Sequence, residues 1–533
     1  MKKITLSLFF ALAFSNVSNA QLGSGWDWAS VSTVATYSPG RHIIDLDTDS
    51  QGNVYGVGRF MGSMTLGAHT ISTLGDGSVN FNFDEDAFLV KYNASGQVQW
   101  LKRFGTAAIA SNQMGQVVCA DASGNVYIGG SGMANATTNS SFLIKYDTNG
   151  NILWSRTDLP LYEINGVNIG PDGNPIVMES NGGVKNIYKM NAATGATIWT
   201  VTNTTGSNGA SRYDDFVDAN GNIYYTCFTS GAASVNIAGV PYTATGLTTF
   251  FASIDTNGVT RWMHPMPEAQ VTLSYTIDRS NGKSYIQIAG GGGGDFQGYS
   301  TVFISGSRYF ELNSAGNVIR NVMLSPYKGL FRVKNGIKYG FITEQGGAAG
   351  TVNYGGYSIN VSAVNTEAFG VILRYNENDD QVSFGNSFKM TGAAWVSGTL
   401  KAIEPTAAKI IVGGYYGATA QFGTGIFSVA SAVGNSPKDM FVAQLNNGVL
   451  DVDTQQKAIF SIFPNPATSV FNIASDAMIN IQSIHIYDML GQKIQTVKPE
   501  ALENIDVSKL NTGTYIIEII SEKGREVKKI VKR

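Results

Sequence analysis

One stretch of the chain, Phe88 to Phe104 (FLVKYNASGQVQWLKRF), recurs along most of its length. Each copy is an apolar run, a tight turn rich in Asn, Asp and Gly, and a second run. The other copies begin at Phe142, Ile187, Phe251, Phe310 and Val371. Asn and Gly adopt the positive φ that hairpin turns require, so each copy predicts a β-hairpin. A hairpin that recurs at long spacing indicates a repeat architecture.

A second hairpin motif precedes these copies. It reads DSQGNVYGVGRF at Asp49 and DASGNVYIGGSG at Asp121, again two strands about a turn. Its turns fall near Gly52, Gly124, Gly173, Gly221, Gly282, Gly336 and Lys409. Two hairpins per repeat give four antiparallel strands, the composition of a propeller blade. The sequence therefore predicts an all-β, seven-bladed β-propeller over residues 21–450. Long insertions between the two hairpins, such as Met61 to Glu85, are expected on one face of the disc.

The strand that the seventh repeat lacks at its end is present at the beginning of the repeat region. Trp28 matches Trp100 in its repeat, so the chain begins with the last strand of a blade, and the seventh repeat shows no clear Trp strand. We therefore expect Trp26 to Thr33 to complete the seventh blade, which closes the ring and removes two open sheet edges. The equivalent tryptophans are predicted to pack between blades rather than form a ligand cage. They are Trp28, Trp100, Trp154, Trp199 and Trp262.

These repeats resemble a bacterial β-propeller repeat family with the consensus D-x-x-G-N-x-Y-x-x-G, followed by D-x-F-x-x-K-Y-D-x-x-G-x-x-x-W. The first copy matches at Asp49, Gly52, Asn53, Tyr55, Gly58, Asp86, Phe88, Lys91, Tyr92, Gly96 and Trp100. The second copy matches as well, whereas copies five to seven lack the Trp and parts of the turn. The resemblance implies the propeller fold that the hairpins predict.

The N-terminus has the pattern of an export signal. Lys2 and Lys3 precede an apolar run, Ile4 to Phe14, that is too short to span a bilayer. Small residues at Ser18 and Ala20 predict cleavage between Ala20 and Gln21, which removes a signal peptide of residues 1–20. No transmembrane segment is predicted, because no later run of 18 apolar residues occurs.

The pattern changes after a short polar linker, residues 451–457. Alternating apolar residues over 458–533 predict short strands in a small β-sandwich. This segment resembles the type A C-terminal sorting domain of the type IX secretion system of Bacteroidetes. The residues that carry the resemblance include Pro464, Asn465, Pro466, Gly491, Gly513, Tyr515, Lys528 and Lys529. The resemblance implies export through the outer membrane by the secretion machinery, removal of the domain by a sortase, and often attachment of the cargo to the cell surface.

Composition and motifs offer little catalytic chemistry. A net charge of −3 does not indicate binding to nucleic acid, which favours a positively charged protein. The histidines are scattered, Cys119 and Cys227 lie in apolar strands, and no C-x-x-C spacing occurs, so zinc is not indicated. A disulfide between the two cysteines stays an alternative to two buried thiols. Asp45, Asp47 and Asp49 have the alternating spacing of a calcium loop, but the Gly and Glu that such a loop needs are missing.

Three functions stay open on this basis. The sequence favours a secreted or cell-surface propeller that binds or adheres to a glycan or a protein, with no catalytic residue and no cofactor apart from the calcium candidate. The first alternative is an enzyme, such as one that degrades polysaccharides, which would need carboxylates that converge on the central channel. The second alternative is a structural component of the cell surface.

Overall fold

All regular elements that the computed structural model describes are β-strands. The described residues are 25–33, 40–74, 85–105, 113–135, 138–205, 215–267, 272–289, 295–300, 307–324, 329–346, 349–354, 357–361, 363–364, 367–375, 382–391, 398–406, 409–423, 425–428, 439–446, 460–475, 481–488, 492–498, 502, 504–521 and 524–533. The chain divides into two compact units, residues 1–449 and 450–533. The predicted linker, 451–457, lies outside the described residues.

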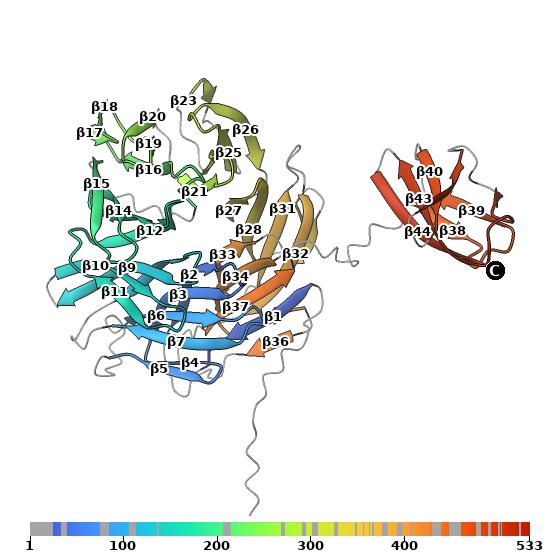
Figure 1. Ribbon diagram of the computed structural model, residues 1–533, viewed down its shortest axis with the longest axis horizontal. Coiled ribbons are helices and arrows are strands. Elements are labelled where there is room, and N and C mark those ends of the chain that lie inside the picture. Colours follow the sequence, from blue (N-terminus) through green and yellow to red (C-terminus); the bar gives the residue numbers. More distant parts are fainter. Residues whose placement is uncertain are drawn as a thin grey trace, which may run out of the picture. The chain divides into compact units, whose positions relative to one another are not determined.

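The first unit is a succession of antiparallel sheets that follow one another around a common centre (Figure 1). The first three sheets in chain order are β2 (Arg41–Thr48), β3 (Val54–Met61), β6 (Glu85–Tyr92) and β7 (Val98–Phe104); then β8 (Met114–Ala120), β9 (Val126–Asn135), β10 (Thr138–Tyr146) and β11 (Ile152–Arg156); and then β12 (Glu163–Ile169), β13 (Pro175–Asn181), β14 (Val184–Met190) and β15 (Thr197–Thr204). The next two are a sheet of β16 (Ile223–Thr229), β19 (Thr248–Ile254) and β20 (Thr260–Pro267), and a sheet of β21 (Thr272–Asp278), β22 (Lys283–Ala289), β25 (Ser307–Leu312) and β26 (Val318–Leu324). The last two are a sheet of β27 (Gly329–Lys334), β28 (Ile337–Gln345), β31 (Glu367–Tyr375) and β32 (Val382–Thr391), and a sheet of β33 (Gly398–Pro405), β34 (Lys409–Tyr416), β37 (Asp439–Asn446) and β1 (Trp26–Val31).

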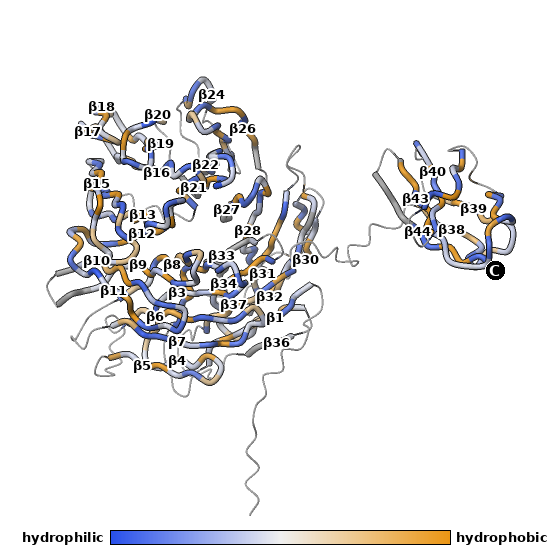
Figure 2. Tube along the Cα trace, viewed as in Figure 1, coloured by the Kyte–Doolittle hydropathy of each residue, from blue (hydrophilic) through white to orange (hydrophobic). Residues whose placement is uncertain are grey.

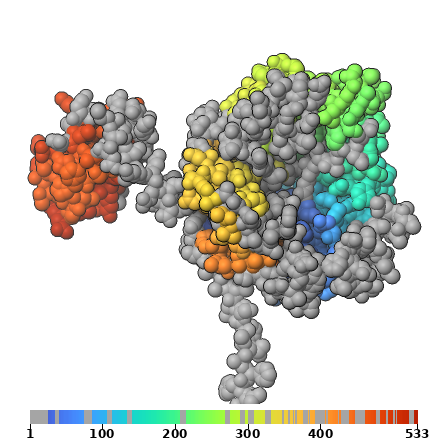
Figure 3. All heavy atoms as spheres, turned by 180° about the vertical axis from the view of Figure 1, so that it is seen from behind, coloured from blue at the N-terminus to red at the C-terminus, as the bar shows by residue number. Residues whose placement is uncertain are grey.

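The first strands of successive sheets contact one another, β33 with β2, β2 with β8, β8 with β12, and β21 with β27. This arrangement is a β-propeller. Hydrophobic residues, orange on the trace of Figure 2, occur along the strands. Their side chains form clusters that join neighbouring sheets. In one such cluster Phe88 and Val90 of one sheet pack with Ile411 and Val442 of another. In the space-filling view from behind, the colours of the first unit pass in sequence order around it (Figure 3).

The first-hairpin motif is a hydrogen-bonded unit. Asp49 Oδ1 accepts the backbone N–H groups of Gln51 and Asn53, each at 2.9 Å. Asp49 Oδ2 accepts the side-chain amide of Asn53 at 2.7 Å and the Tyr55 hydroxyl at 3.1 Å. Gly52 provides the positive φ of the turn, +79°. The pattern D-x-x-G-N-x-Y is therefore the set of residues that one turn needs to satisfy its own polar groups.

The N-terminal strand pairs as the sequence predicts. β1 lies antiparallel to β37, with Trp28 opposite Gln444 and Ala29 opposite Ala443, in the sheet that also contains β34 and β33. Asp27 of β1 forms an ion pair with Lys409 and accepts a 3.0 Å hydrogen bond from the Gln444 side chain. The first described strand of the chain thus completes the sheet formed by the last strands of the repeat region.

The predicted packing of the tryptophans between sheets is confirmed. Trp100 Nε1 donates to the Thr148 carbonyl in the turn of the following sheet at 3.1 Å. Trp154, Trp199 and Trp262 make the same contact with Ala192, Thr256 and Ser314, at 3.1, 3.2 and 3.1 Å. These rings lie so close to the turn glycines that an added Cβ at Gly195 or Gly316 would come within 3 Å of indole carbon. Each indole thus ties one sheet to the next.

The insertions form hairpins of their own rather than simple loops. They are β4 (Ser63–Leu66) with β5 (His69–Ser72), β17 (Ala233–Ile237) with β18 (Val240–Ala244), β23 (Asp295–Phe296) with β24 (Tyr299–Ser300), β29 (Gly350–Asn353) with β30 (Ser358–Val361), and β35 (Thr419–Phe422) with β36 (Gly425–Ser428). β17 joins the preceding sheet at β15, and β35 joins the preceding sheet at β32. These two hairpins therefore cover the outer edge of a neighbouring sheet, which the sequence did not predict.

The second unit consists of two antiparallel sheets with one apolar core. The first contains β38 (Phe460–Phe463), β39 (Val470–Ser475) and β42 (Ile505–Asp506), and the second contains β41 (Lys493–Val497), β40 (Ile481–Tyr487), β43 (Gly513–Ser521) and β44 (Gly524–Lys532). The alternation in SIHIY places Ile484 and Ile486 in the core beside Phe471.

Candidate functional site

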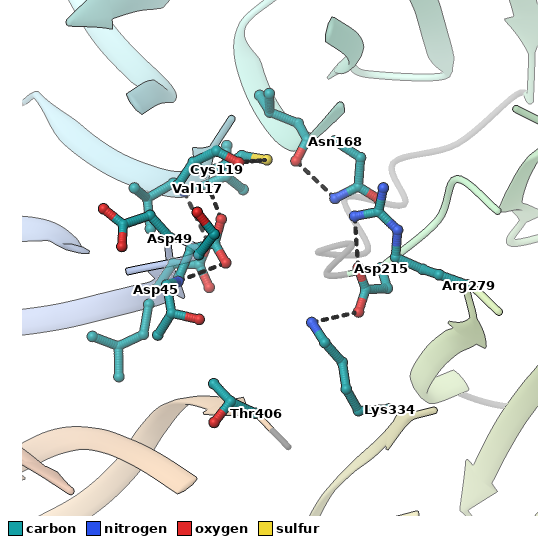
Figure 4. Close-up of a pocket in the computed structure, with 16 residues that line it drawn as sticks. Asp45, Asp49, Val117, Cys119, Asn168, Asp215, Arg279, Lys334 and Thr406 are labelled. Atoms are coloured by element: carbon teal, nitrogen blue, oxygen red, sulfur yellow. Dashed lines mark hydrogen bonds and ion pairs between the residues drawn. The ribbon is translucent and has the colours of Figure 1, made fainter. Parts of the chain in front are cut away.

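A polar cavity of about 340 Å³ lies where the first strands of the propeller sheets end (Figure 4). Its wall comes from segments far apart in sequence. Six sheets contribute residues at or just beyond the end of their first strand, and the fourth contributes Asp215, which precedes β16. The lining residues are Asp45 to Ser50, Val117 to Ala120, Val167, Asn168, Asp215, Arg279, Lys334 and Thr406. The cavity therefore combines contributions from sheets all around the propeller.

One wall of the cavity carries two cations around a single carboxylate. Arg279 Nη1 lies 3.5 Å from Asp215 Oδ1, and Lys334 Nζ lies 3.6 Å from Asp215 Oδ2. Arg279 Nη2 also donates to the Ile169 carbonyl at 2.9 Å, which fixes the direction of the guanidinium. The Arg279 side chain is 38% exposed and that of Lys334 is 29% exposed. Both cations are therefore accessible from the cavity.

The facing wall is acidic (Figure 4). Asp45 Oδ2 accepts the backbone N–H of Val118 at 2.9 Å, and Asp47 Oδ2 accepts that of Ala120 at 2.6 Å. Asp47 Oδ1 accepts the Thr48 N–H at 2.8 Å. The bonds to Val118 and Ala120 join β2 to β8 of the next sheet. Burial raises the pKa of the half-buried Asp47 carboxyl to about 6, although the charge of Lys334 opposes the shift.

Two further side chains complete the lining. Asn168 Oδ1 accepts the N–H groups of Phe216 and Val217, at 2.7 and 3.2 Å, and so joins β12 to the next sheet. Cys119 is buried, and burial raises the pKa of its thiol well above the ordinary value, so the reactive thiolate is disfavoured. Cys119 and Cys227 are both free and buried, as the simpler sequence interpretation predicts.

The three calcium candidates lie in this region but direct their oxygens to protein N–H and O–H donors. Asp45 and Asp47 join two sheets, and Asp49 organises the turn of its own hairpin. Within the residues that the structure describes, no three His, Cys, Asp or Glu side chains are grouped as a metal site would require. Calcium binding by Asp45, Asp47 and Asp49 stays a prediction.

The residues of the sorting motif come together in the second unit. Asn465, between Pro464 and Pro466, donates from Nδ2 to the Lys529 carbonyl at 2.8 Å and accepts the Val531 N–H at 2.9 Å. The opening of the motif is thereby fixed to the last strand, β44, which also carries Lys528. Lys529 is exposed on that strand.

The remaining motif residues follow on the neighbouring strand. Gly513 and Tyr515 lie on β43, where the Tyr515 hydroxyl donates to the Asn511 carbonyl at 2.9 Å. Gly491, and the predicted cleavage site at Ala20 and Gln21, lie outside the described residues.

Sequence reasoning did not predict Asp215, Arg279 or Lys334 as site residues. A signal was nonetheless present, since each lies shortly before the first turn glycine of its own repeat, at Gly221, Gly282 and Gly336. In a propeller the ends of the first strands meet at the centre, so this stretch of every repeat lines the channel. Comparison of the stretch across the repeats would have grouped the three residues.

Comparison with known proteins identifies the C-terminal segment. Residues 461–533 match the family model described as the secretion system C-terminal sorting domain. This domain marks proteins exported by the type IX secretion system, so the protein is secreted or displayed at the cell surface. No helix of the described residues is long and apolar enough to cross a membrane. No curated protein matches the chain in sequence.

Several solved structures are similar to the repeat region at low identity. The polysaccharide lyase Uly1 is 10% identical, with 78% of this chain and 92% of that chain covered and a TM-score of 0.39. The propeller domain of the Trilobed protease from Pyrococcus furiosus is 8% identical, with 74% and 100% covered and a TM-score of 0.38. A streptogramin B lyase is 10% identical, with 79% and 98% covered and a TM-score of 0.34. None of these likenesses says what this chain binds.

Proposed function

We propose that the chain is an exported propeller that acts as a binding or adhesion module at the cell surface. Its ligand, a glycan or a protein, engages the cavity at the ends of the first strands. The observation that carries this proposal is the accessible pair Arg279 and Lys334, which faces the cavity across from Asp45 and Asp47. Accessible charges in a concave site with converging polar groups are typical of ligand binding.

The proposal includes a propeller of seven blades that β1 closes. In its support, six sheets of the first unit begin with a predicted first hairpin, and in the remaining sheet the predicted turn at Gly221 precedes β16. β1 supplies the outer strand beside β37. A ring closed by pairing of its two ends resists opening, since no end strand is left without a neighbour. Such a rigid ring suits a site assembled from many sheets.

For the second unit we propose a small β-sandwich that serves export and is then removed. Two sheets with one shared core support the sandwich, and the match to a sorting domain supports the role. The partners would be the type IX secretion machinery and a sortase of a member of the Bacteroidetes. The propeller would then remain outside the cell, either released or attached to its surface.

One observation favours an enzyme as the second candidate. Asp47 lines the cavity with a pKa of about 6, and a carboxyl group that titrates near neutral pH can exchange protons with a bound substrate. Arg279 and Lys334 across the cavity could stabilise negative charge in such a reaction. The binding function is preferred because both Asp47 oxygens already accept backbone N–H groups.

The test is a binding screen of the purified full chain against glycans and proteins of the cell envelope, with and without calcium. The same samples are assayed for released sugars or peptides. Binding without product is the expected result, with loss of binding in the Arg279→Gln variant. Product formation would instead support the enzyme, and binding that disappears on calcium removal would support a calcium site, with Asp45, Asp47 and Asp49 as its candidates.

A further inference from the structure

We infer that the group that enters the cavity is a small zwitterion, with an amine on the Asp45 and Asp47 side and a carboxylate on the Arg279 and Lys334 side. The inference rests on the proposed function, because it takes the cavity as the binding site. It adds the chemical class of the ligand. A free amino acid or a dipeptide is the simplest molecule of this class.

The cationic wall has the capacity to bind a carboxylate. A guanidinium has five N–H donors in a planar fork, which matches the two oxygens of a carboxylate. Among the described residues, Arg279 contacts Asp215 through Nη1 and the Ile169 carbonyl through Nη2. Since the contact with Asp215 is 3.5 Å long, Arg279 retains donors for a ligand, and Lys334 adds charge at the same place.

The acidic wall has the capacity to bind an amine. A carboxylate offers about four acceptor positions, and Asp47 uses one on each oxygen, for Ala120 and Thr48. Each oxygen can therefore accept a further N–H from an ammonium group. Asp45 lies beside it on the same strand and adds negative charge to this wall.

Opposite walls select against ligands with one kind of charge. A ligand with only negative groups meets Asp45 and Asp47, and a ligand with only positive groups meets Arg279 and Lys334. A dipolar ligand satisfies both walls, so like-charge repulsion acts as a filter. The volume of about 340 Å³ is near the lower end of small-molecule sites, which suits a ligand of this size. None of the described residues that line the cavity is aromatic, so they offer no flat apolar platform for a sugar face.

The experiment is titration calorimetry of the full chain with free amino acids and dipeptides. Each probe is compared with its N-acetyl form and its C-terminal amide, and glucuronate and glucosamine serve as probes with a single charge. We expect at least one zwitterion to bind and to lose about tenfold or more in affinity when either end is blocked. Arg279→Gln and Asp47→Asn should each weaken binding to a similar extent.

The control is Lys283→Gln, since Lys283 pairs with Glu311 at 2.8 Å and does not line the cavity. It should bind as the unmodified protein does. If circular dichroism shows that Arg279→Gln does not fold, Arg279→Lys replaces it. Lysine keeps the positive charge but lacks the planar guanidinium that binds both carboxylate oxygens. The Arg279→Lys variant should therefore still bind the zwitterion more weakly than the unmodified protein.

Equal binding of blocked and free forms, binding of glucuronate alone, or binding by no zwitterion would each overturn the inference. The proposed function fails separately. If a glycan or protein ligand is lost in Arg279→Gln but no zwitterion binds, only the inference fails. If that ligand binds both cavity variants normally, the cavity is not the binding site and both fail.

Discussion

The turn glycine of the second hairpin has two roles at the scale of single residues. Gly96 has a φ of +78°, which side chains with a Cβ rarely adopt. It also lies beneath the Trp28 ring, so that an added Cβ would come within 2.3 Å of Trp28 Cδ2. Gly173 has the same φ of +78°, but a Cβ added there would meet nothing within 4 Å. Substitution of Gly173 tests backbone strain alone, whereas substitution of Gly96 tests backbone strain together with packing between sheets.

We predict that Gly96→Ala lowers the free energy of unfolding more than Gly173→Ala does. Both variants incur the cost of a left-handed backbone, about 1 kcal/mol. Gly96→Ala adds an overlap with a buried indole, about 1–3 kcal/mol more. Chemical unfolding of the two variants measures the difference. Equal losses would mean that the Trp28 contact contributes little to stability.

Asp47 predicts a specific dependence of stability on pH. Its pKa rises from the ordinary value of 3.8 to about 6 in the folded protein, because burial disfavours the charge; Lys334 opposes this shift, and Asp215 adds to it. Arg279 across the cavity and Cys119 on the same wall as Asp47 also interact with it. The folded state thus binds more protons than the unfolded state between these values. The contribution of Asp47 to stability must therefore increase as the pH falls through 6.

We expect the stability difference between the unmodified protein and Asp47→Asn to shift in favour of the unmodified protein as the pH falls from 7 to 5. Denaturant titrations at several pH values measure it. Asp172→Asn is the control, since hydrogen bonds from Lys189 and Asn174 outweigh burial and lower the pKa of Asp172. Its difference should stay flat over this range, because Asp172 titrates below it. A flat profile for Asp47→Asn as well would contradict the assigned pKa.

At the scale of elements, a buried ion pair joins the first and last sheets of the propeller. Arg41 on β2 donates from Nη1 to Asp439 Oδ1 on β37 at 2.8 Å, and the two side chains are 1% and 0% exposed. The same Asp439 oxygen accepts the Ser32 hydroxyl at 3.2 Å, just after β1. Arg41 also donates to the Ser63 carbonyl at 3.3 and 3.1 Å. The pair therefore fixes β1, β2 and β37 at the place where the ring would close.

We predict that Arg41→Met costs about 3–5 kcal/mol of unfolding free energy, because it leaves the buried Asp439 charge uncompensated. The double variant Arg41→Met with Asp439→Leu should recover most of that loss. Arg59→Met is the matched control, since Arg59 pairs with Glu85 at the same 2.8 Å but is 32% exposed, and should cost about 1 kcal/mol or less. A double variant as unstable as Arg41→Met would show that packing, and not charge, dominates here.

Some of these elements could be predicted from the sequence and others could not. The hairpins, the pairing of β1 and the tryptophan contacts could be predicted, because they depend on turn residues and patterns that every repeat contains. The edge hairpins β17–β18 and β35–β36 could not, since their partners β15 and β32 belong to other repeats and pairing at a sheet edge leaves no local signature. The cavity residues Arg279 and Lys334 fall between these cases. They lie in the same stretch of each repeat, just before the first turn glycine, but the residue type there differs between repeats, so no single repeat marks them.

At the scale of the whole molecule, the two units differ in what they contribute. The second unit carries the sorting domain and, in it, Asn465 fixes the opening motif to the basic final strand. The first unit provides the scaffold in which the repeats satisfy their own turns and join their neighbours. The charges of the cavity, and above all Arg279 and Lys334, are what this scaffold leaves accessible at its centre.

The most direct test of this account is whether the ligand of the exported protein is bound at the cavity. The full chain and its Arg279→Gln variant, matched for folding by circular dichroism, are compared for binding to envelope glycans and proteins. We expect binding by the unmodified protein and a loss of at least about tenfold in the variant, with Lys283→Gln unaffected. Equal binding by all three proteins would place the ligand elsewhere and contradict the account.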